Sequence, residues 1–214
     1  MEELTYITEG KNQYTVFWDH SLNGGGMLFG PEYPAIIREL FPDRVFDTCL
    51  EWCSGPGFIG YNLLDHGICK NLVLNDIHQP ALDMANKTMI HNKLQDNVQL
   101  YCSGKIDDIP KHIRFDLVVG NPPHYNRKWL NENSRIADDE NWLIHKYFYN
   151  NITEYLTDDG IVLLQENGDG SKPEDFYDMI EKSNLKVTKV IQSPNHCTEA
   201  PTLIYYIMSQ KTRI

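Results

Sequence analysis

The amino-acid sequence predicts a single α/β domain with a seven-stranded, mostly parallel sheet, an antiparallel edge strand and helices on both faces. Three observations carry this prediction: short apolar runs of strand length, segments with helical spacing between most of them, and a short connection before the last run. The chain has 214 residues, of which 41% are hydrophobic, so one large domain with a sizeable core is expected.

Short apolar runs bounded by turn residues are typical of buried strands. Seven such runs lie at residues 45–50, 72–74, 98–101, 115–119, 161–164, 185–191 and 203–208. Segments with apolar residues at helical spacing lie at residues 57–66, 79–92, 141–156 and 173–183. Strands that alternate with helices pair in parallel, because each helix returns the chain to the same end of the sheet.

The two ends of the chain need separate treatment. The last two runs are joined by a loop at residues 193–201, which is too short for a crossover helix, so these strands should pair antiparallel at an edge. Residues 1–44 precede the first core strand, and a short helix is expected at 35–40, after Pro34. We expect residues 1–44 to form an extension packed on the core and residues 45–214 to form the main domain.

Composition limits the class of protein. The 30 acidic residues outnumber the 19 basic ones, and a net charge of -11 disfavours a broad nucleic-acid surface. Five scattered cysteines beside apolar runs indicate reduced thiols. No run approaches the roughly 18 apolar residues of a membrane span, and the first residues are polar. A cytoplasmic protein without a membrane partner is expected, and its oligomeric state is unknown.

A glycine-rich turn follows the first predicted strand. The stretch LEWCSGPGFIG opens a helix there, and its glycines allow backbone amides to approach a ligand. The next strand ends in LVLND, which places Asp76 where a carboxylate can bind two ribose hydroxyls. These features predict a nucleoside-cofactor site. Gly55, Gly57 and Gly60 also fit the pattern G-x-G-x-x-G, so an NAD-dependent oxidoreductase is an alternative.

Glu51 lies just before this turn and bears on the choice of cofactor. A carboxylate there does not help to bind a pyrophosphate, but it can pair with the ammonium group of an amino acid. S-adenosylmethionine carries both a nucleoside and such an ammonium group. Glu51 therefore favours S-adenosylmethionine over a dinucleotide.

The stretch FDLVVGNPPHY is a predicted strand that stops at Asn121. Ligands of open parallel sheets bind beyond the carboxyl ends of the strands. Pro122 and Pro123 restrict the backbone, so the Asn121 oxygen and the Pro122 carbonyl can accept both hydrogens of a planar NH2 group. This aims the nitrogen lone pair at a methyl sulfonium, while His124 or Tyr125 could stack on the acceptor or take up its proton. The motif predicts an N-methyltransferase, and we call residues 121–124 the acceptor bracket.

The three stretches LEWCSGPG, LVLND and FDLVVGNPPHY together resemble the class I S-adenosylmethionine-dependent methyltransferases, in the amino-methylating group with an N-P-P-aromatic signature. That group includes HemK-type protein glutamine methyltransferases and the amino-methylases of adenine and guanine in nucleic acids. The likeness covers about residues 28–210 and implies the Rossmann-like, seven-stranded sheet of that family.

The resemblance assigns roles to individual residues. The expected cofactor-binding residues are Phe29, Glu51, Cys53, Gly55, Gly57, Asp76, Ile77, Ser103 and Asn121. The expected catalytic residues are Asn121, Pro122, Pro123, His124 and Tyr125. Residues 29–37 resemble the segment that closes over the methionine end of the cofactor, and Ile77 matches the apolar residue that flanks the adenine.

Three departures from the family pattern also carry expectations. Cys53 stands where the family usually has its first glycine, so a displaced or tighter turn is expected. Ser103 lies where an acid normally binds the adenine amine, so Asp107 or a backbone group would have to substitute. His124 replaces the usual Tyr or Phe. These departures leave open a methyltransferase-like binding subunit without activity.

The methyl acceptor is not named by these motifs. Chain length and acidic charge favour a protein side chain or a small molecule. Arg127, Lys128 and Arg135, with Trp129 among them, form a basic and aromatic loop that could bind a phosphate or a base, so an RNA or DNA base methyltransferase is an alternative. The histidines lack the paired spacing of metal ligands, and no metal is expected.

Overall fold

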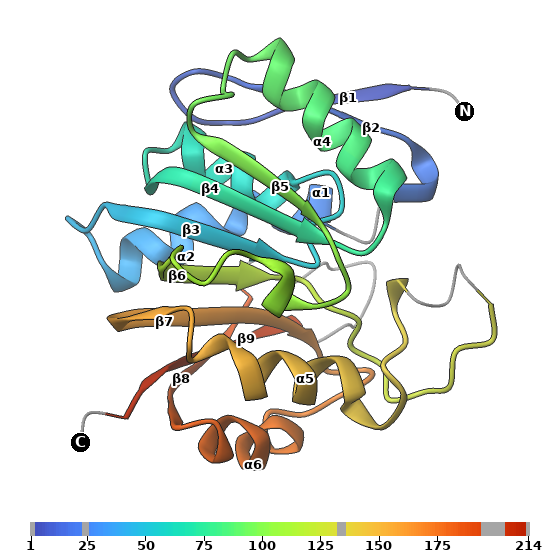
Figure 1. Ribbon diagram of the computed structural model, residues 1–214, viewed down its shortest axis with the longest axis vertical. Coiled ribbons are helices and arrows are strands. Elements are labelled where there is room, and N and C mark those ends of the chain that lie inside the picture. Colours follow the sequence, from blue (N-terminus) through green and yellow to red (C-terminus); the bar gives the residue numbers. More distant parts are fainter. Residues whose placement is uncertain (1–2, 23–25, 132–135, 194–203, 213–214) are drawn as a thin grey trace. The chain divides into compact units, whose positions relative to one another are not determined.

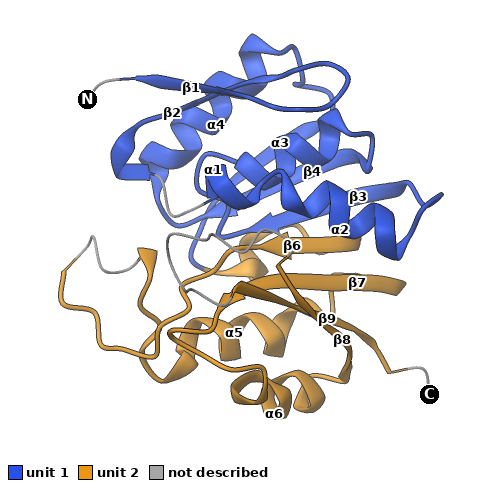
Figure 2. Cartoon of the chain, turned by 180° about the vertical axis from the view of Figure 1, so that it is seen from behind, with its two compact units in different colours: residues 1–104 blue, residues 105–214 orange. Residues whose placement is uncertain are grey.

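The computed structural model describes residues 3–22, 26–131, 136–193 and 204–212 (Figure 1). Contacts divide the chain into two compact units, residues 1–104 and residues 105–214, which are coloured separately in Figure 2. Strands that match all seven predicted apolar runs are present, three in the first unit and four in the second. The predicted loop at 193–201 lies almost entirely outside the described residues.

The first unit is built on three parallel strands. These are β3 (Phe46–Trp52), β4 (Cys69–Asp76) and β5 (Val98–Cys102), in the order β5-β4-β3. The connections contain α3 (Phe58–Asp65) and α4 (Gln79–His91), as the helical spacing predicted. Leu72, Val73 and Leu74 are at most 1% exposed, which explains why β4 reads as a continuous apolar run rather than an alternating one.

The chain before β3 contains a hairpin that the sequence analysis missed. It consists of β1 (Leu4–Ile7) and β2 (Thr15–Trp18), which pair antiparallel. The buried Asp65 carboxylate at the end of α3 accepts hydrogen bonds from the amide of Gly10 at 2.8 Å and from the Thr8 hydroxyl at 2.5 Å. The hairpin is therefore fastened to α3 by a carboxylate distant in sequence, and Figure 1 shows it beside α4 as well.

Three short helices lie between the hairpin and β3. They are η1 (His20–Leu22), α1 (Gly26–Phe29) and α2 (Glu32–Leu40). The helix expected at 35–40 is present but begins earlier, so that Pro34 lies in its first turn. Proline is tolerated there because the amides of a first turn have no partner within the helix.

The second unit carries the remaining four strands of the sheet. These are β6 (Phe115–Gly120), β7 (Leu156–Asn167), β8 (Leu185–Gln192) and β9 (Ile204–Lys211), in the order β6-β7-β9-β8. β6 and β7 are parallel, whereas β9 is antiparallel to both β7 and β8. The predicted antiparallel pairing of the last two strands is confirmed, with β8 at the edge.

Two longer helices of this unit, α5 (Leu143–Ile152) and α6 (Glu174–Lys182), lie side by side (Figure 1). The short helices η2 (Ile106–Asp108) and η4 (Glu140–Trp142) precede β6 and α5. The helix predicted at 141–156 was wrong at both ends. Asn141 and Trp142 have φ values of 56° and 57°, so a regular helix begins only after them, and Leu156 already belongs to β7.

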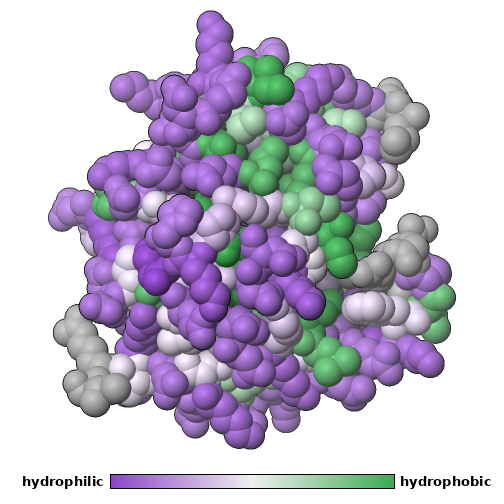
Figure 3. Space-filling view, viewed as in Figure 1, coloured by the Kyte–Doolittle hydropathy of each residue, from purple (hydrophilic) through white to green (hydrophobic). Residues whose placement is uncertain are grey.

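Polar side chains cover most of the surface seen in Figure 3, as the large number of charged residues requires. In the part of the chain that the structure describes, no helix is both long enough and apolar enough to cross a membrane. The same residues contain no group of three or more His, Cys, Asp or Glu side chains arranged to hold a metal ion.

Candidate active site

The turn between β3 and α3 contains three residues with positive φ. The values are 53° for Cys53, 52° for Gly55 and 88° for Gly57. Glycine adopts this left-handed conformation freely, whereas a Cβ atom makes it unfavourable. Cys53 thus takes the conformation that a glycine favours, at the position where the family pattern has one. We call residues 53–57 the cofactor turn.

The glycines around this turn differ in the space beside them. A Cβ atom on Gly57 would lie 2.8 Å from Leu74 Cδ1, and one on Gly60 would lie 2.7 Å from Glu51 Oε2. These two glycines are needed for close packing. Among the described residues, a Cβ atom on Gly55 would meet only the Leu22 carbonyl, at 3.9 Å, which leaves room there for a ligand to approach.

Glu51 lies in β3 and is only 2% exposed. Its carboxylate accepts hydrogen bonds from the Gly60 amide at 2.7 Å and the Ile59 amide at 3.3 Å, at the start of α3. Burial raises the pKa of Glu51 to about 8, although these two amides oppose the shift. The side chain therefore joins β3 to the first turn of α3, and its predicted contact with an ammonium group stays a prediction.

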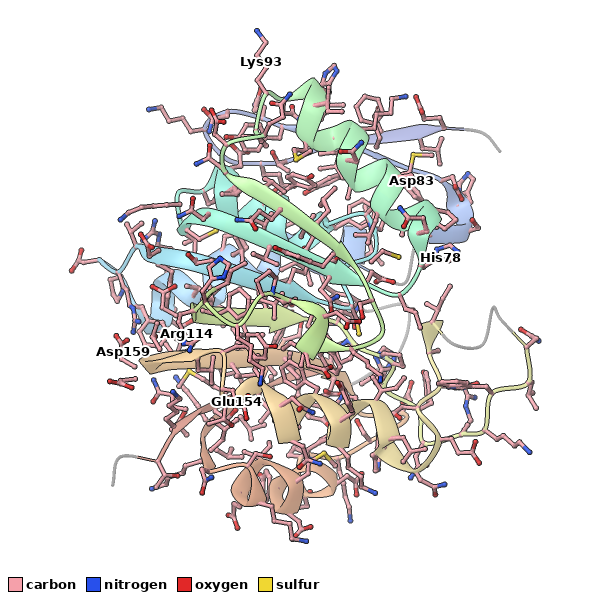
Figure 4. The ribbon with its side chains drawn as sticks, in the orientation of Figure 1. His78, Asp83, Lys93, Arg114, Glu154 and Asp159 are labelled. Atoms are coloured by element: carbon pink, nitrogen blue, oxygen red, sulfur yellow. The ribbon has the colours of Figure 1, made fainter. Side chains whose placement is uncertain are left out.

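Asp76 ends β4 beside the cofactor turn. One carboxylate oxygen accepts the Gly55 amide at 2.7 Å, and the other accepts the amide of His78 at 2.8 Å; His78 is labelled at the start of α4 in Figure 4. Burial raises the pKa of Asp76, and these amides oppose the shift. Each oxygen accepts one of these amide bonds, and a carboxylate oxygen can accept two bonds, so a pair of ribose hydroxyls can still be bound.

The ends of β4 and β5 lie next to each other. The Asn75 side chain donates to the carbonyls of Tyr101 and Ser103, both at 3.1 Å, and the Ser103 amide donates to the Asp76 carbonyl at 2.8 Å. Ile77 is 54% exposed, so an apolar surface is available beside Asp76. Asp107, the suggested substitute for the adenine-binding acid, accepts the hydroxyl of Tyr147 with one oxygen, and its contact with adenine stays a prediction.

Phe29 lies at the end of α1, which contacts α3. A Cβ atom on Gly30 would lie 3.0 Å from the Phe58 carbonyl, so this segment runs closely past the first residue of α3. Phe29, Glu51, the cofactor turn and Asp76 are thus all gathered around the start of α3. Sequence reasoning missed the preceding segment, whose Leu22 carbonyl comes closest to Gly55.

The acceptor bracket lies in the second unit, directly after Gly120 of β6. Pro122 and Pro123 are buried, whereas Asn121 and His124 are partly exposed. Buried prolines with fixed φ hold the backbone on either side in one conformation. The sequence-based prediction that β6 stops at this motif is confirmed.

Tyr125 is held from several sides. Its amide donates to the Ala137 carbonyl at 2.9 Å, and its own carbonyl accepts the Asp139 amide at 2.8 Å. A Cβ atom on Gly170 would lie 2.5 Å from the Tyr125 ring, and the Arg127 guanidinium lies 4.2 Å from its centroid. These contacts hold Tyr125 in one position directly after the acceptor bracket.

His124 is adjacent to Tyr125, with 5.1 Å between the ring centroids. Its Nδ1 atom is buried and has no hydrogen-bond partner among the described residues. Burial lowers the pKa of His124 to about 4; the charges of His145 and Arg127 act in the same direction, and a contact with the Pro122 carbonyl opposes them. The ring is uncharged at neutral pH and can accept a hydrogen bond or a proton.

The basic loop after the bracket is partly neutralised. Arg127 forms an ion pair with Asp138 at 2.7 Å, and the Trp129 indole donates to the Asp138 carbonyl at 2.5 Å. Trp129 is 41% exposed. Arg135 lies outside the described residues.

Sequence reasoning missed a buried charged cluster in this unit, made of Asp139, His145 and Glu166. His145 had been considered only as a metal ligand and set aside. A signal was present, because Glu166 is an acid at the carboxyl end of the apolar run that forms β7. In parallel sheets this is the end at which functional groups gather.

Comparison with known proteins gives the family. The profile of the methyltransferase small domain matches residues 34–163, which is more than half of the chain. The chain belongs to the methyltransferase small domain family. The resemblance drawn from the three sequence motifs is therefore confirmed, and the family and its fold imply S-adenosylmethionine as the methyl donor.

Two curated relatives are similar to this family member over part of their length. The release factor glutamine methyltransferase of Leptospira interrogans is 30% identical over 125 residues, which are 56% of this chain and 43% of that protein. Ribosomal RNA small subunit methyltransferase C of Haemophilus influenzae is 36% identical over 91 residues, which are 42% of this chain and 26% of that protein. The chain thus matches less than half of either relative.

A solved structure supports the fold. An S-adenosylmethionine-dependent methyltransferase from Clostridium acetobutylicum superposes with a TM-score of 0.62 at 15% identity, and covers 85% of this chain and 91% of that one. The predicted Rossmann-like methyltransferase fold, with its mostly parallel seven-stranded sheet, is confirmed.

The residues of the methyltransferase small domain fit S-adenosylmethionine in three respects. In the part of the chain that the structure describes, there is room beside Gly55, the Asp76 oxygens can accept hydrogen bonds from hydroxyl groups, and Ile77 offers an exposed apolar side chain. Amide, carboxylate and apolar surface are the contacts that a nucleoside requires.

Replacing Cys53 by glycine should stabilise the protein by roughly 0.5–1 kcal/mol. The left-handed conformation costs a residue with a Cβ atom about 1–2 kcal/mol, which exceeds the roughly 0.4–1 kcal/mol that glycine loses through its freer unfolded chain. Urea denaturation measures the difference. Cys53→Ala is the matched control, because it keeps the Cβ atom and the strain. A glycine variant no more stable than the alanine variant would contradict this account.

Replacing Glu51 by glutamine should change the pH dependence of stability. The folded pKa of Glu51, about 8, is above its ordinary value of 4.5, so the stability it contributes is present below pH 4.5 and is lost as the pH rises to about 8. Glutamine does not ionise. The free energy of unfolding of Glu51→Gln, relative to the parent, should therefore rise between pH 5 and 8, by up to about 1.4 kcal/mol per pH unit.

Urea denaturation at pH 5, 6, 7 and 8 checks this expectation. The exposed Glu39 of α2 supplies the matched control, because Glu39→Gln removes the same group from solvent-exposed surface of the same unit. A flat difference between Glu51→Gln and the parent over this range would show that Glu51 is ionised throughout.

Proposed function

We propose that the chain is an S-adenosylmethionine-dependent N-methyltransferase that methylates a planar amide or amine nitrogen held by Asn121, Pro122, Pro123 and His124. The observation that carries the proposal is the acceptor bracket directly after Gly120, at the carboxyl end of β6, with both prolines buried. Membership of the methyltransferase small domain family supports the same reaction class.

S-adenosylmethionine, when bound, supplies a methyl group on a positively charged sulfur. The chain's own residues would hold its nucleoside: Asp76 through the ribose hydroxyls, Ile77 along the base, and the open backbone at Gly55 beside them. Phe29, Glu51, Cys53, Gly57 and Ser103 complete the proposed cofactor set. Glu51, Cys53 and Gly57 do so by shaping the cofactor turn and its junction with α3.

The bracket would orient the acceptor nitrogen. The Asn121 side-chain oxygen and the Pro122 carbonyl can each accept one hydrogen of a planar NH2 group, which leaves the nitrogen lone pair directed out of the plane. His124 is uncharged at neutral pH, because its pKa is lowered to about 4, first by burial and then by nearby positive charge. Its ring nitrogen can therefore receive the proton that a methylated nitrogen releases.

A protein side-chain amide is the favoured acceptor. The relative from Leptospira interrogans is named as a glutamine methyltransferase that acts on a release factor, and a glutamine amide is a planar NH2 group of the kind the bracket would hold. The net charge of -11 supports the same choice, because it opposes binding of a polyanion.

Ribosomal RNA is the second candidate acceptor. The relative from Haemophilus influenzae is named as a ribosomal RNA methyltransferase, and the exocyclic amine of a base is also planar. Lys128 and the partly exposed Trp129 follow the bracket and could contact a nucleotide. Against this, Arg127 is ion-paired with Asp138, which reduces the positive charge that the loop offers to a phosphate.

Methyl transfer to a cell extract tests the proposed function and its acceptor. The protein is incubated with an extract and with S-adenosylmethionine carrying a labelled methyl group, and the extract is then separated into protein, RNA and small molecules. Label is expected in protein, on a glutamine amide, whereas label in RNA would select the second candidate. Thermal stabilisation by NAD and not by S-adenosylmethionine, together with no transfer, would overturn the proposal.

Replacing Asn121 by alanine should reduce methyl transfer by about 100-fold or more, because the acceptor loses one of the groups that orient it. The dissociation constant of S-adenosylmethionine, measured by calorimetry, should change less than about threefold. Asn150→Ala removes an identical side chain from the exposed face of α5 and serves as the control. Parental turnover in Asn121→Ala would refute the role of the bracket.

A further inference from the structure

His145 of α5 is completely buried between two carboxylates. Its Nδ1 lies 2.7 Å from Asp139 Oδ2, and its Nε2 lies 3.0 Å from Glu166 Oε1, with all three side chains at most 1% exposed. A ring nitrogen can donate to a carboxylate only when it carries a hydrogen, so two such contacts favour the doubly protonated ring. Burial lowers the pKa of His145, but Glu166 and Asp139 outweigh burial and raise it to about 9.

Such a cluster is a poor source of stability. Removing three ionisable groups from water costs several kcal/mol for each ion, and well-packed apolar residues often replace buried ion pairs without loss. What a buried ion pair can contribute is conformational specificity, because it holds the elements around it in one arrangement. The role of the cluster therefore depends on which elements His145 holds together.

Asp139 connects the cluster to the chain just after the bracket. Its amide donates to the Tyr125 carbonyl at 2.8 Å, and its carboxylate accepts the amides of Ile144 at 2.9 Å and His145 at 3.1 Å. The same residue thus ties the backbone of Tyr125 to the first turn of α5. The bond between the Asp139 amide and the Tyr125 carbonyl is one of the two that form an isolated parallel β-bridge between Tyr125 and Asp138; the other runs from the Tyr125 amide to the Ala137 carbonyl.

Glu166 connects the cluster to the strand beside the bracket. In the register of β6 and β7, Gly120 pairs with Leu164. Because these strands are parallel, the chain beyond Gly120 continues along the side of β7 on which residues 165 and 166 follow. His145 therefore joins α5 to β7 at the level of the acceptor bracket. Asp139 joins α5 to Tyr125, the residue that directly follows the bracket.

The surroundings of the cluster contain further titratable groups. Tyr149 of α5 and Tyr205 of β9 both interact electrostatically with Glu166, and the charge of His145 reaches His124. The rings of Trp142 and Phe176 close the remaining sides of His145, with centroids at 5.6 Å and 4.8 Å. Both ring nitrogens are bonded and the ring is enclosed, so His145 cannot itself touch a methyl acceptor.

We propose that His145, held between Asp139 and Glu166, is a positioning residue that fixes residues 121–125 at the end of β6 and so determines how the acceptor nitrogen is presented. The proposal rests on the proposed function for its catalytic consequence, but its structural part stands on these contacts alone. His145 acts through Asp139 on the backbone of Tyr125.

Two readouts test the positioning role without any assay of activity. In His145→Gln, hydrogen exchange at the Asp139 amide, which donates to Tyr125, should become at least about 10-fold faster relative to global unfolding. In the same variant, nuclear magnetic resonance should show His124 titrating at a higher pH than in the parent, because a nearby positive charge is removed while two carboxylates remain.

Tyr155→Phe is the matched control in the same unit. It removes one buried hydrogen bond, from the Tyr155 hydroxyl to the Ile109 carbonyl at 3.1 Å. Tyr155 lies beside Phe115, at the opposite end of β6 from Asn121. The control should change neither exchange at Asp139 nor the titration of His124. If His145→Gln does not fold, Glu166→Gln supplies the hydrogen-exchange readout, because it keeps an oxygen acceptor for Nε2 but removes the negative charge that holds His145.

The catalytic part is tested by separating turnover from binding. His145→Gln should lower kcat by about 10- to 100-fold, with less than about a twofold change in the dissociation constant of S-adenosylmethionine. Unchanged exchange and an unchanged His124 titration in a folded variant would overturn the positioning role. If both readouts change in His145→Gln but the parent protein methylates no protein, RNA or small molecule, the positioning role is supported and the proposed function is wrong.

Discussion

The hydrogen bond from the Gly55 amide to the Asp76 carboxylate is the contact on which the cofactor half of the structure depends. It joins the turn after β3 to the end of β4, and it forms because Cys53, Gly55 and Gly57 all adopt left-handed conformations. Glu51 fixes the other side of the same turn through the first amides of α3. Two acidic side chains from adjacent strands thus hold one short loop, and among the described residues only the Leu22 carbonyl lies near Gly55 on the side that a Cβ atom would occupy.

In the second unit, the acceptor bracket is held in position by a different kind of contact. Proline has no amide hydrogen, so Pro122 and Pro123 cannot donate backbone hydrogen bonds. Fewer hydrogen bonds are therefore available to hold the acceptor bracket in place. Its position depends on what lies around it: Gly170 behind Tyr125, the backbone of Ala137 and Asp139, and the buried His145 cluster. Rigidity here comes from tertiary contacts rather than from secondary structure.

The sequence predicted the strands and the two motifs because each depends on local signals. Short apolar runs show where buried strands lie, and glycine and proline show where the chain leaves them. The hairpin at residues 4–18 was missed because its strands are four residues long and are held by Asp65, fifty or more residues away. The end of α5 was misplaced because Leu156 has an apolar character that fits a helix face as well as the buried start of β7.

Side-chain roles were harder to predict than elements, because a sequence shows which charge is present but not what already neutralises it. The predicted contact of Glu51 with an ammonium group stays a prediction, but the sequence did not show that its oxygens also accept backbone amides of α3. The loop with Arg127 was an alternative site for a phosphate, and the sequence did not show that Arg127 is paired with Asp138 and lies over Tyr125. The sequence assigned no role to His145, which in the structure lies buried between two carboxylates.

Under the proposed function, these contacts bear on how an acceptor is selected. A bracket of two oxygen acceptors recognises any planar NH2 group, so it cannot by itself distinguish a glutamine amide from a base. Discrimination must come from the surface that surrounds the bracket, where Arg127 is already ion-paired and Trp129 is partly exposed. The ion-paired charge of Arg127 contributes little to binding a polyanion, whereas the exposed ring of Trp129 can still stack on a partner. This surface is therefore better suited to an apolar or neutral partner than to a phosphate backbone.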